Sequence, residues 1–324
     1  MKRLIYILMS IGLLTACSSD DNEKSTTTSN KRVALNIIAG IERQPQGITR
    51  ATETSWETDD NIGVYMTGYK TYSIFTDGDG TRAENLEYTF GDGTNYETWV
   101  ANDHVYRLFS PSSKKIYLSS TSIDVYGYYP YKPSLTNPRE YQIDLSSQDN
   151  QKALDFMTAK HENANNAAET IQLLFHHRLT KLVFNLRQGE GLLAGELKKS
   201  TISPFTIDHQ PTTATYNIYT SGLTIPSGVY DDGSTITPKK MDAVATGYDL
   251  TYEAVILPNN DDTNRATNRT VTITFYTNED DKITNTFTID SDTHFEEGCK
   301  YVYNVTVNAM SITVDTEEKF TDQW

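Results

Sequence analysis

The stretch Val33-Ala34-Leu35-Asn36-Ile37-Ile38-Ala39-Gly40-Ile41 decides the fold class of this chain. Apolar residues recur in it at every second position. Because successive side chains of a strand point to opposite faces, the pattern predicts a half-buried β-strand. The predicted buried face consists of Val33, Leu35, Ile37, Ala39 and Ile41. A segment with proline and glycine, residues 44–50, follows the strand and has no apolar face, so we expect it to be exposed.

More segments of strand length follow along the chain, separated by clusters of Gly, Pro, Asn and Asp. This spacing is typical of β-sandwiches, and it predicts an all-β chain with two sandwich domains in tandem. We place the domains at residues 33–164 and 165–324, because the one stretch rich in helix formers, Leu154–Asn166, lies between them. The predicted strands are Ile62–Met66, Glu87–Phe90, Lys115–Leu118, Ser122–Tyr129, Ile171–Leu186, Thr215–Tyr219, Leu250–Leu257, Thr270–Thr277, Lys282–Ile289 and Lys300–Val307.

The composition excludes several classes of protein. With 324 residues, of which 37% are hydrophobic and 22% charged, the chain can bury ordinary cores and is neither disordered nor a polytopic membrane protein. Acidic residues outnumber basic ones by 43 to 28, which gives a formal net charge of -15. Such a negative protein repels phosphate backbones, so nucleic acid is not an expected partner.

The chain begins with the pattern of a secretion signal. Lys2 and Arg3 precede an apolar run, Leu4–Leu14, of about 11 residues, whereas about 20 are needed to cross a membrane. The next residues, Leu14-Thr15-Ala16-Cys17, resemble the bacterial lipobox, in which the signal peptide is cut before a cysteine that receives lipid. The resemblance implies that residues 1–16 are a lipoprotein signal peptide and that Cys17 is lipidated and carries palmitate. An ordinary cleavage site with Cys17 as an incidental residue is the alternative.

The residues after the signal are expected to form a tether. Residues 17–32 contain no periodic apolar face and should be flexible. Their acidic cluster, Ser18–Glu23, looks like the surface-export signal of Bacteroidota lipoproteins. Once Cys17 is lipidated, Cys299 is the only remaining thiol, so no intrachain disulfide can form and stability must come from packing.

The sequence contains no motif that indicates catalysis, a metal or a cofactor. His176 and His177 are neighbours in a predicted strand, so they point to opposite faces and cannot share a metal ion; a distant partner for one of them is the alternative. The turn Asp77–Thr81 resembles a calcium loop only superficially, since Arg82 and Tyr88 stand where an EF-hand needs Gly and Glu. A nucleophile elbow, a phosphate-binding loop and a His-Glu-x-x-His pair are all missing, so we do not expect an enzyme.

Clustered tyrosines are the remaining candidate site. The segments Tyr65–Tyr72 and Tyr126–Tyr131 could form platforms on which sugars stack, as in a surface lipoprotein that binds glycans. Strand alternation places every second residue of the latter segment on one face, which favours packing in a core or between domains. An exposed strip of Tyr128, Tyr131 and Trp99 would support the glycan-binding alternative.

Six further segments carry a family resemblance. They are Trp56 with Asp60–Tyr65, Val125–Tyr131, Leu154–Met157, Phe175–Leu182, Ala254–Pro258, and Gly298 with Tyr301–Val305. In this order and spacing, and together with the lipobox, they resemble the Bacteroidales fimbrillins, which are the subunits of type V pili. The resemblance implies two transthyretin-like β-sandwiches, in agreement with the two domains above. It also implies a surface-anchored pilus subunit or adhesin at the cell outer membrane.

The resemblance further implies a route of assembly. An Arg-specific protease removes the amino-terminal strand, and the groove left behind accepts a strand from another subunit by donor-strand exchange. The matching bond joins Arg50 to Ala51, in the connector expected to be exposed; Arg43 and Arg32 are less favoured. Burial of four or five aliphatic side chains at roughly 2 kcal/mol each would hold the exchanged strand with about 8 to 10 kcal/mol. The implied partners are other fimbrillin subunits, the outer membrane through the lipid, and a host or bacterial surface receptor or glycan.

The carboxyl end is the candidate donor strand. Met310, Ile312 and Val314 alternate with polar residues there. Thr316–Lys319 then breaks the alternation, so the tail could equally close its own second domain. A tail unable to donate would indicate a tip or accessory subunit.

Overall fold

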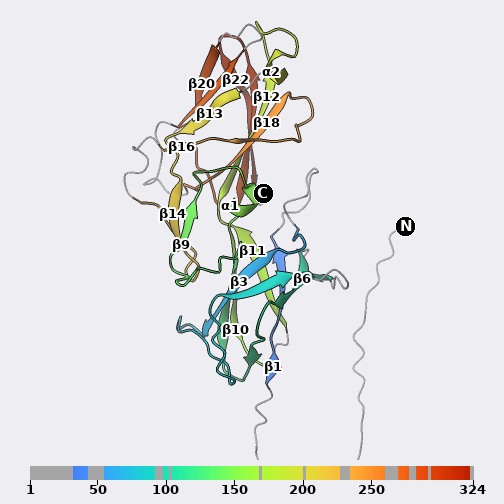
Figure 1. The fold of residues 1–324 in the computed structure, drawn as a ribbon, viewed down its shortest axis with the longest axis vertical. Helices are drawn as coiled ribbons and strands as arrows, with labels where there is room; N and C mark the ends of the chain where they lie inside the picture. The colour runs from blue at the N-terminus through green and yellow to red at the C-terminus, as the bar shows by residue number, and fades with distance from the viewer. Residues whose placement is uncertain are drawn as a thin grey trace, which may run out of the picture. The chain divides into compact units, whose positions relative to one another are not determined.

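The computed structural model describes residues 32–42, 55–91, 98–101, 104–167, 170–199, 202–226, 234–259, 269–276, 282–290 and 293–321 (Figure 1). Within these ranges the regular elements are strands, apart from two single-turn helices, α1 (Gln151–Leu154) and α2 (Glu196–Lys199). The prediction of an all-β chain is therefore confirmed. Among the described residues, no helix is both long and apolar enough to span a membrane.

Seven strands close into one barrel-like sheet. They are β2 (Asn36–Ile41), β3 (Asn61–Gly68), β4 (Leu86–Phe90), β6 (His104–Pro111), β8 (Ile123–Tyr129), β10 (Met157–Ala164) and β11 (Thr170–His177). Their order is β2-β11-β10-β8-β3-β4-β6, and β6 pairs again with β2, which completes the ring. The short strand β5 (Thr98–Ala101) pairs with the other side of β6. Because alternate residues of each strand turn inward, a continuous apolar cluster forms inside the ring.

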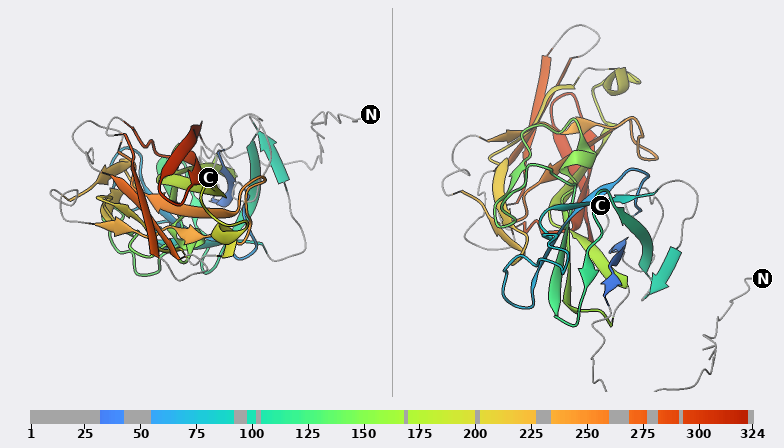
Figure 2. Two further views of the ribbon diagram at one scale, coloured as in Figure 1. Left: turned by 90° about the horizontal axis from the view of Figure 1, so that it is seen from above. Right: turned by 60° about the horizontal axis from the view of Figure 1, so that its bottom comes forward.

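The remaining strands form smaller sheets. β1 (Val33–Ala34) pairs with β7 (Tyr117–Leu118), and β9 (Tyr141–Asp144), β14 (Thr213–Asn217) and β15 (Gly222–Thr224) form a three-stranded sheet. A five-stranded sheet has the order β17 (Lys239–Lys240), β18 (Leu250–Ile256), β12 (Thr180–Gln188), β21 (Cys299–Val307) and β22 (Ile312–Thr321); these last two strands are coloured red in Figure 2. A four-stranded sheet has the order β16 (Thr235–Ile236), β13 (Ile202–Asp208), β19 (Thr270–Tyr276) and β20 (Lys282–Thr288).

The five-stranded and four-stranded sheets share one apolar core. Phe184 of β12 and Phe205 of β13 meet edge to face across it, with ring centroids 5.2 Å apart. Phe184 also stacks on Tyr303 of β21 at 5.3 Å. This pair of sheets agrees with the sandwich predicted for the second half. The first half differs, because its strands curl into a single closed sheet instead of two facing sheets. Two transthyretin-like sandwiches in tandem are therefore not confirmed.

Leu154–Asn166, the stretch rich in helix formers that marked the predicted domain boundary, lies largely within the barrel-like sheet. Most of this stretch is β10, which pairs with β8 on one side and with β11 on the other. Met157 and Ala159 contribute to the apolar interior of the ring, so burial between two strands outweighs the weak helix propensity of the segment.

Sheet membership changes inside a segment predicted as one strand. Ile171–Leu186 consists of β11 in the barrel-like sheet and β12 in the five-stranded sheet, so the change occurs between His177 and Thr180. The predicted division into residues 33–164 and 165–324 therefore does not coincide with the sheets. The three-stranded sheet also joins β9, from before residue 164, to β14 and β15. By their contacts, the described residues from Arg32 onward form one compact unit.

Tyrosines connect the barrel-like sheet with the three-stranded sheet. Tyr126 and Tyr128 belong to the same apolar cluster as Tyr216 of β14, and the ring centroids of Tyr126 and Tyr219 lie 4.8 Å apart. Gly63 is required beneath this layer, because a Cβ at that position would lie 2.0 Å from the ring of Tyr128.

Candidate functional site

The candidate site is the position of β2 between β6 and β11. β2 runs parallel to β11, from the pair Asn36–Thr170 to the pair Ile41–Phe175. It runs antiparallel to β6, from Ile37–Phe109 to Gly40–Tyr106. A single amino-terminal strand therefore closes the ring by pairing on both of its edges (Figure 1).

The prediction of a half-buried strand was wrong for the second face, because Ile38 is 1% exposed and Gly40 is buried as well. The predicted buried face lies in the core, with one exception. Leu35, Ile37, Ala39 and Ile41 are at most 4% exposed and belong to the apolar cluster inside the ring. Val33 differs from the prediction: it is only partly buried and pairs with Leu118 in the separate ladder of β1 and β7. Val33 and Ala34 therefore lie outside the ring, and the chain enters it at Leu35. The buried face predicted from the alternation began two residues too early.

Trp56, which follows the segment after β2 in the sequence, contacts β2 and its neighbouring strands. Its indole N–H donates to the carbonyl of Ala39 at 3.0 Å. Its ring meets Phe109, Tyr129 and Phe175 edge to face, with ring centroids 5.1, 5.5 and 5.2 Å apart. The tryptophan therefore packs on strands from both sides of the β2 position.

Arg32, the residue just before β1, is held in place by an ion pair. The Arg32 guanidinium donates to both carboxylate oxygens of Asp79, at 2.7 and 2.6 Å, and lies 5.0 Å from the ring centroid of Tyr117. Asp79 in turn holds the pKa of Arg32 above its ordinary value through this hydrogen bond, and Arg32 lowers the pKa of Asp79.

The turn that carries Asp79 is a glycine-containing turn, as predicted. Asp77 is buried, and its carboxylate accepts from the backbone N–H groups of Asp79, Thr81 and Tyr117 at 2.9, 2.9 and 3.2 Å. The carboxylates of this turn are thus engaged by protein donors.

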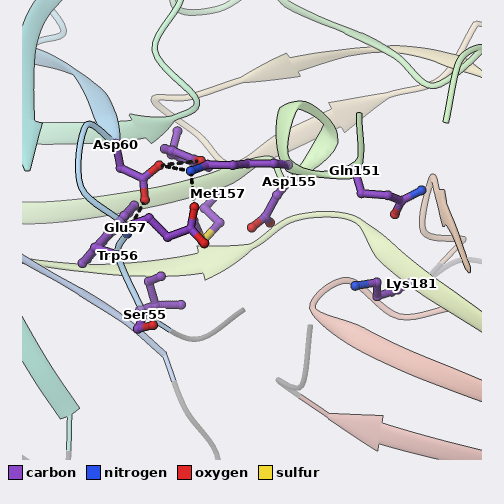
Figure 3. A pocket seen from close by; sticks show the side chains of 11 residues that line it. Ser55, Trp56, Glu57, Asp60, Gln151, Asp155, Met157 and Lys181 are labelled. Carbon is purple, nitrogen blue, oxygen red and sulfur yellow. Dashed lines mark hydrogen bonds and ion pairs between the residues drawn. The ribbon is translucent and has the colours of Figure 1, made fainter. Parts of the chain in front are cut away.

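The carboxyl end of β2 adjoins a pocket of about 280 Å³ (Figure 3). Ile41, Trp56, Tyr129 and Met157 supply apolar surface, and Lys181 and residues of α1 supply polar surface. Lys152 bridges two carboxylates, with Nζ 2.6 Å from Glu57 Oε2 and 2.9 Å from Asp60 Oδ1; Figure 3 draws these contacts as dashed lines. The hydroxyl of Tyr129 donates to Asp60 at 3.0 Å, and burial followed by the charge of Asp60 raises the pKa of this tyrosine.

The two neighbouring histidines point to different partners. His176 Nδ1 contacts the carboxylate of Glu42, whose backbone N–H donates to the carbonyl of Phe175. His177 is buried, and its Nδ1 lies 2.7 Å from Asp155 Oδ1. Within the described ranges, no group of three His, Cys, Asp or Glu side chains is arranged to hold a metal ion. The two histidines thus connect β11 to the residue after β2 and to the residue after α1, respectively.

The clustered tyrosines do not form the strip that glycan binding would need. Tyr128 is fully buried, and Tyr126 is 1% exposed. Tyr131 is partly buried and packs against the same cluster. The side chain of Trp99 lies outside the described part of the structure. Packing in a core, one of the predictions for these residues, is confirmed for Tyr126 and Tyr128.

The other predicted site residues fall in two groups. Cys17, Arg50 and Ala51 lie outside the described residues. The candidate donor residues are described: Met310 is 93% exposed in the turn before β22, and Ile312 and Val314 are partly buried within that strand. β22 continues through Thr316–Lys319, where the alternation of apolar and polar residues ends, and it pairs with β21 of the same chain, as in the alternative in which the tail closes its own second half.

Sequence reasoning missed two parts of the site. β6 was not predicted, although its sequence Val105–Phe109 is rich in β-branched, aromatic and aliphatic residues, which favour strands. The clamp on Arg32 carries no sequence signal, because its partner lies 47 residues away.

Comparison with known proteins decides the family. The model of the fimbrillin-like family matches residues 49–321. The chain belongs to the fimbrillin-like family. A Bacteroides uniformis protein described as fimbrium subunit Fim1C is 28% identical over 328 residues, which cover 98% of this chain and 93% of that protein. The resemblance stated from the sequence is thereby confirmed.

Solved structures agree with this fimbrillin-like chain. The crystal structure of a Bacteroides uniformis protein described as a cell adhesion protein superposes with a TM-score of 0.64 at 25% identity, covering 92% of this chain and 100% of the other. A Bacteroides ovatus protein with the same description superposes with a TM-score of 0.55 at 18% identity, covering 90% and 99% of the two chains. The latter likeness concerns the fold alone.

Proposed function

We propose that this fimbrillin-like protein is a fimbrial subunit or adhesin that assembles by replacement of its amino-terminal strand. In this proposal, an Arg-specific protease cuts between Arg50 and Ala51, β2 leaves, and a strand of another subunit takes its position. The role is structural and needs no catalytic group or cofactor. Lipid on Cys17 would hold the precursor at the outer membrane, with residues 17–32 as a tether.

The observation that carries the proposal is the place of β2 in the closed sheet. It is the first strand of the ring along the chain, it pairs on both edges, and together with the preceding Leu35 it supplies four aliphatic side chains to the interior. Arg43 and Arg50 follow it within nine residues of its last residue, Ile41. A single cut in this connector would separate the whole strand from the rest of the chain while the other six strands of the ring stay covalently joined.

The energetics favour refilling the position. Burial of the four large aliphatic side chains Leu35, Ile37, Ile38 and Ile41 at roughly 2 kcal/mol each contributes about 8 kcal/mol. Removal of β2 would also leave the facing edges of β6 and β11 without partners, and unpaired sheet edges bind other strands readily. A segment with apolar residues at alternate positions would therefore bind there.

The experiment compares two arginine variants in cells that assemble fimbriae. We expect Arg50→Ala to leave the chain at its monomer mass on a gel run without boiling, whereas Arg43→Ala enters high-mass species like the wild type. The wild-type protein recovered from these species should begin at Ala51. Entry of the Arg50→Ala chain into high-mass species would overturn the proposed cut.

A further inference from the structure

The proposed function leaves open which strand this chain gives to a neighbour, and the following inference rests on that function. We infer that β22 remains in its own sheet, so that it is not the strand this chain gives to a neighbour. The β2 position of this chain is then refilled by the tail of a different kind of subunit.

The first argument is the pairing of β22. The strand pairs with β21 along its whole length, from Ile312 opposite Val307 to Thr321 opposite Cys299. The register shifts once, between Asn304 and Val305, so that Asp315 forms the bulge. The carboxylate of Asp315 accepts from the Thr306 hydroxyl at 2.6 Å and lies 3.1 Å from Arg187 Nη2. The irregular point of the tail is therefore tied to two other strands.

Packing at both ends of the strand adds to this pairing. Ile312 and Val314 pack against the apolar core of the second half. Near the other end, Lys319 Nζ lies 2.5 Å from Glu296 Oε1, and the Lys300 ammonium lies 5.6 Å from the ring centroid of Phe320. Donation would break these contacts and expose the edge of β21.

The sequence of the tail also fits the β2 position poorly. β2 and the residue before it present four apolar side chains at alternate positions, Leu35, Ile37, Ala39 and Ile41. The tail has only three in succession, Met310, Ile312 and Val314. Any set of four alternate positions that contains all three also contains Asn308 or Thr316. Donation would thus place a polar side chain in the apolar ring, which is unfavourable unless the group finds a hydrogen-bond partner.

A disulfide that locks β22 to β21 tests the inference. Val302 and Glu318 face each other across the two strands, and neither is fully buried, so Val302→Cys with Glu318→Cys places two thiols within bonding reach. We expect the locked chain to give the same ladder of high-mass species as the wild type. A ladder that shortens when the lock is oxidised and recovers on reduction would overturn the inference. The two single cysteine variants control for pairing with Cys299.

A peptide experiment separates this inference from the proposed function. The full chain cut after Arg50 is mixed with labelled peptides of residues 33–42 and of residues 308–317. We expect the first peptide to bind, and the second to bind at least about tenfold more weakly, because it would bury a polar side chain in the apolar ring. Failure of both peptides would overturn the proposed function. Equal binding of the tail peptide would overturn the inference alone.

Discussion

Among single residues, Arg32 shows how contacts within the fold can limit cleavage by an Arg-specific protease. Three arginines, Arg32, Arg43 and Arg50, lie close to β2 in the sequence. A cut after Arg32 would leave β2 attached to the chain, so only cuts after the strand can free it. An Arg-specific protease must bind the guanidinium of the residue before the bond, and that of Arg32 is held on Asp79 and beside Tyr117.

The clamp predicts a change in the pattern of cleavage. We expect Asp79→Asn to raise the rate of trypsin cleavage after Arg32 by a factor of roughly two to five, the modest effect typical of an exposed ion pair. The measurement is the yield of the new amino terminus at Val33 in limited digestion followed by mass spectrometry. Glu84→Gln is the matched control, since it removes the partner of Arg82 at 2.8 Å and leaves Arg32 untouched. Equal yields from wild type and Asp79→Asn would contradict this role.

The sequence predicted which residues of β2 face the core, but not the long-range contacts that hold the strand in place. Leu35, Ile37, Ala39 and Ile41 follow from periodicity, because a strand with one apolar face must bury it. The contacts of Trp56 with Ala39 and of Arg32 with Asp79 join residues that are far apart in sequence. Such contacts depend on how the strands are arranged in space, and local pattern contains no information on that arrangement.

Among the elements, β2 has the clearest link between packing and assembly. Ile37→Ala should lower the free energy of unfolding of the uncut chain by about 3 kcal/mol, because Ile37 is fully buried and its truncation leaves a cavity. Asn36→Ala, at the exposed neighbouring position, should change it little. Urea unfolding of the purified chains measures both values.

The same variants distinguish β2 from the rest of the core. After cleavage and removal of the strand, Ile37→Ala and wild type consist of identical residues, so their melting temperatures should agree. A stability loss that persists after removal would mean that cleavage does not release the segment containing Ile37.

Strand prediction worked where β-branched and aromatic residues are frequent and failed at β10, where charged and polar residues interrupt them. β3, β8, β18 and β21 were predicted because Val, Ile and Tyr dominate them. β10 was not predicted as a strand, since Lys160, His161 and Glu162 are not fully buried and hide the strand pattern. The closed ring itself was not foreseen, because closure depends on the long-range pairing of β2 with β6.

For the whole molecule, buried tyrosines make stability depend on pH in the alkaline range. Burial raises the pKa of Tyr219 to about 12, with the neighbouring Tyr126 adding to the effect, and burial alone raises that of Tyr252 to about 12. The pKa of Tyr128 and that of Tyr141 are also raised, chiefly by burial. In the unfolded chain these phenols ionise near pH 10, their ordinary value.

The sign of the effect follows from these pKa values. Below about pH 10 both states keep their phenolic protons and stability is unaffected. Between about pH 10 and 12 the unfolded chain loses protons that the folded chain keeps, so the melting temperature should fall steadily. Thermal unfolding across this range, with absorbance at the tyrosinate band, measures the effect. Uniform ionisation near pH 10 without a change in melting temperature would contradict the burial of these rings.

The pairing of β2, parallel on one edge and antiparallel on the other, has a consequence for any strand that replaces it. Whichever way such a strand runs, it meets one neighbour of the same sense and one of the opposite sense. The main-chain ladders therefore offer the newcomer no preferred polarity. Its direction must be chosen by the sequence of side chains along it and by how far its tether can stretch.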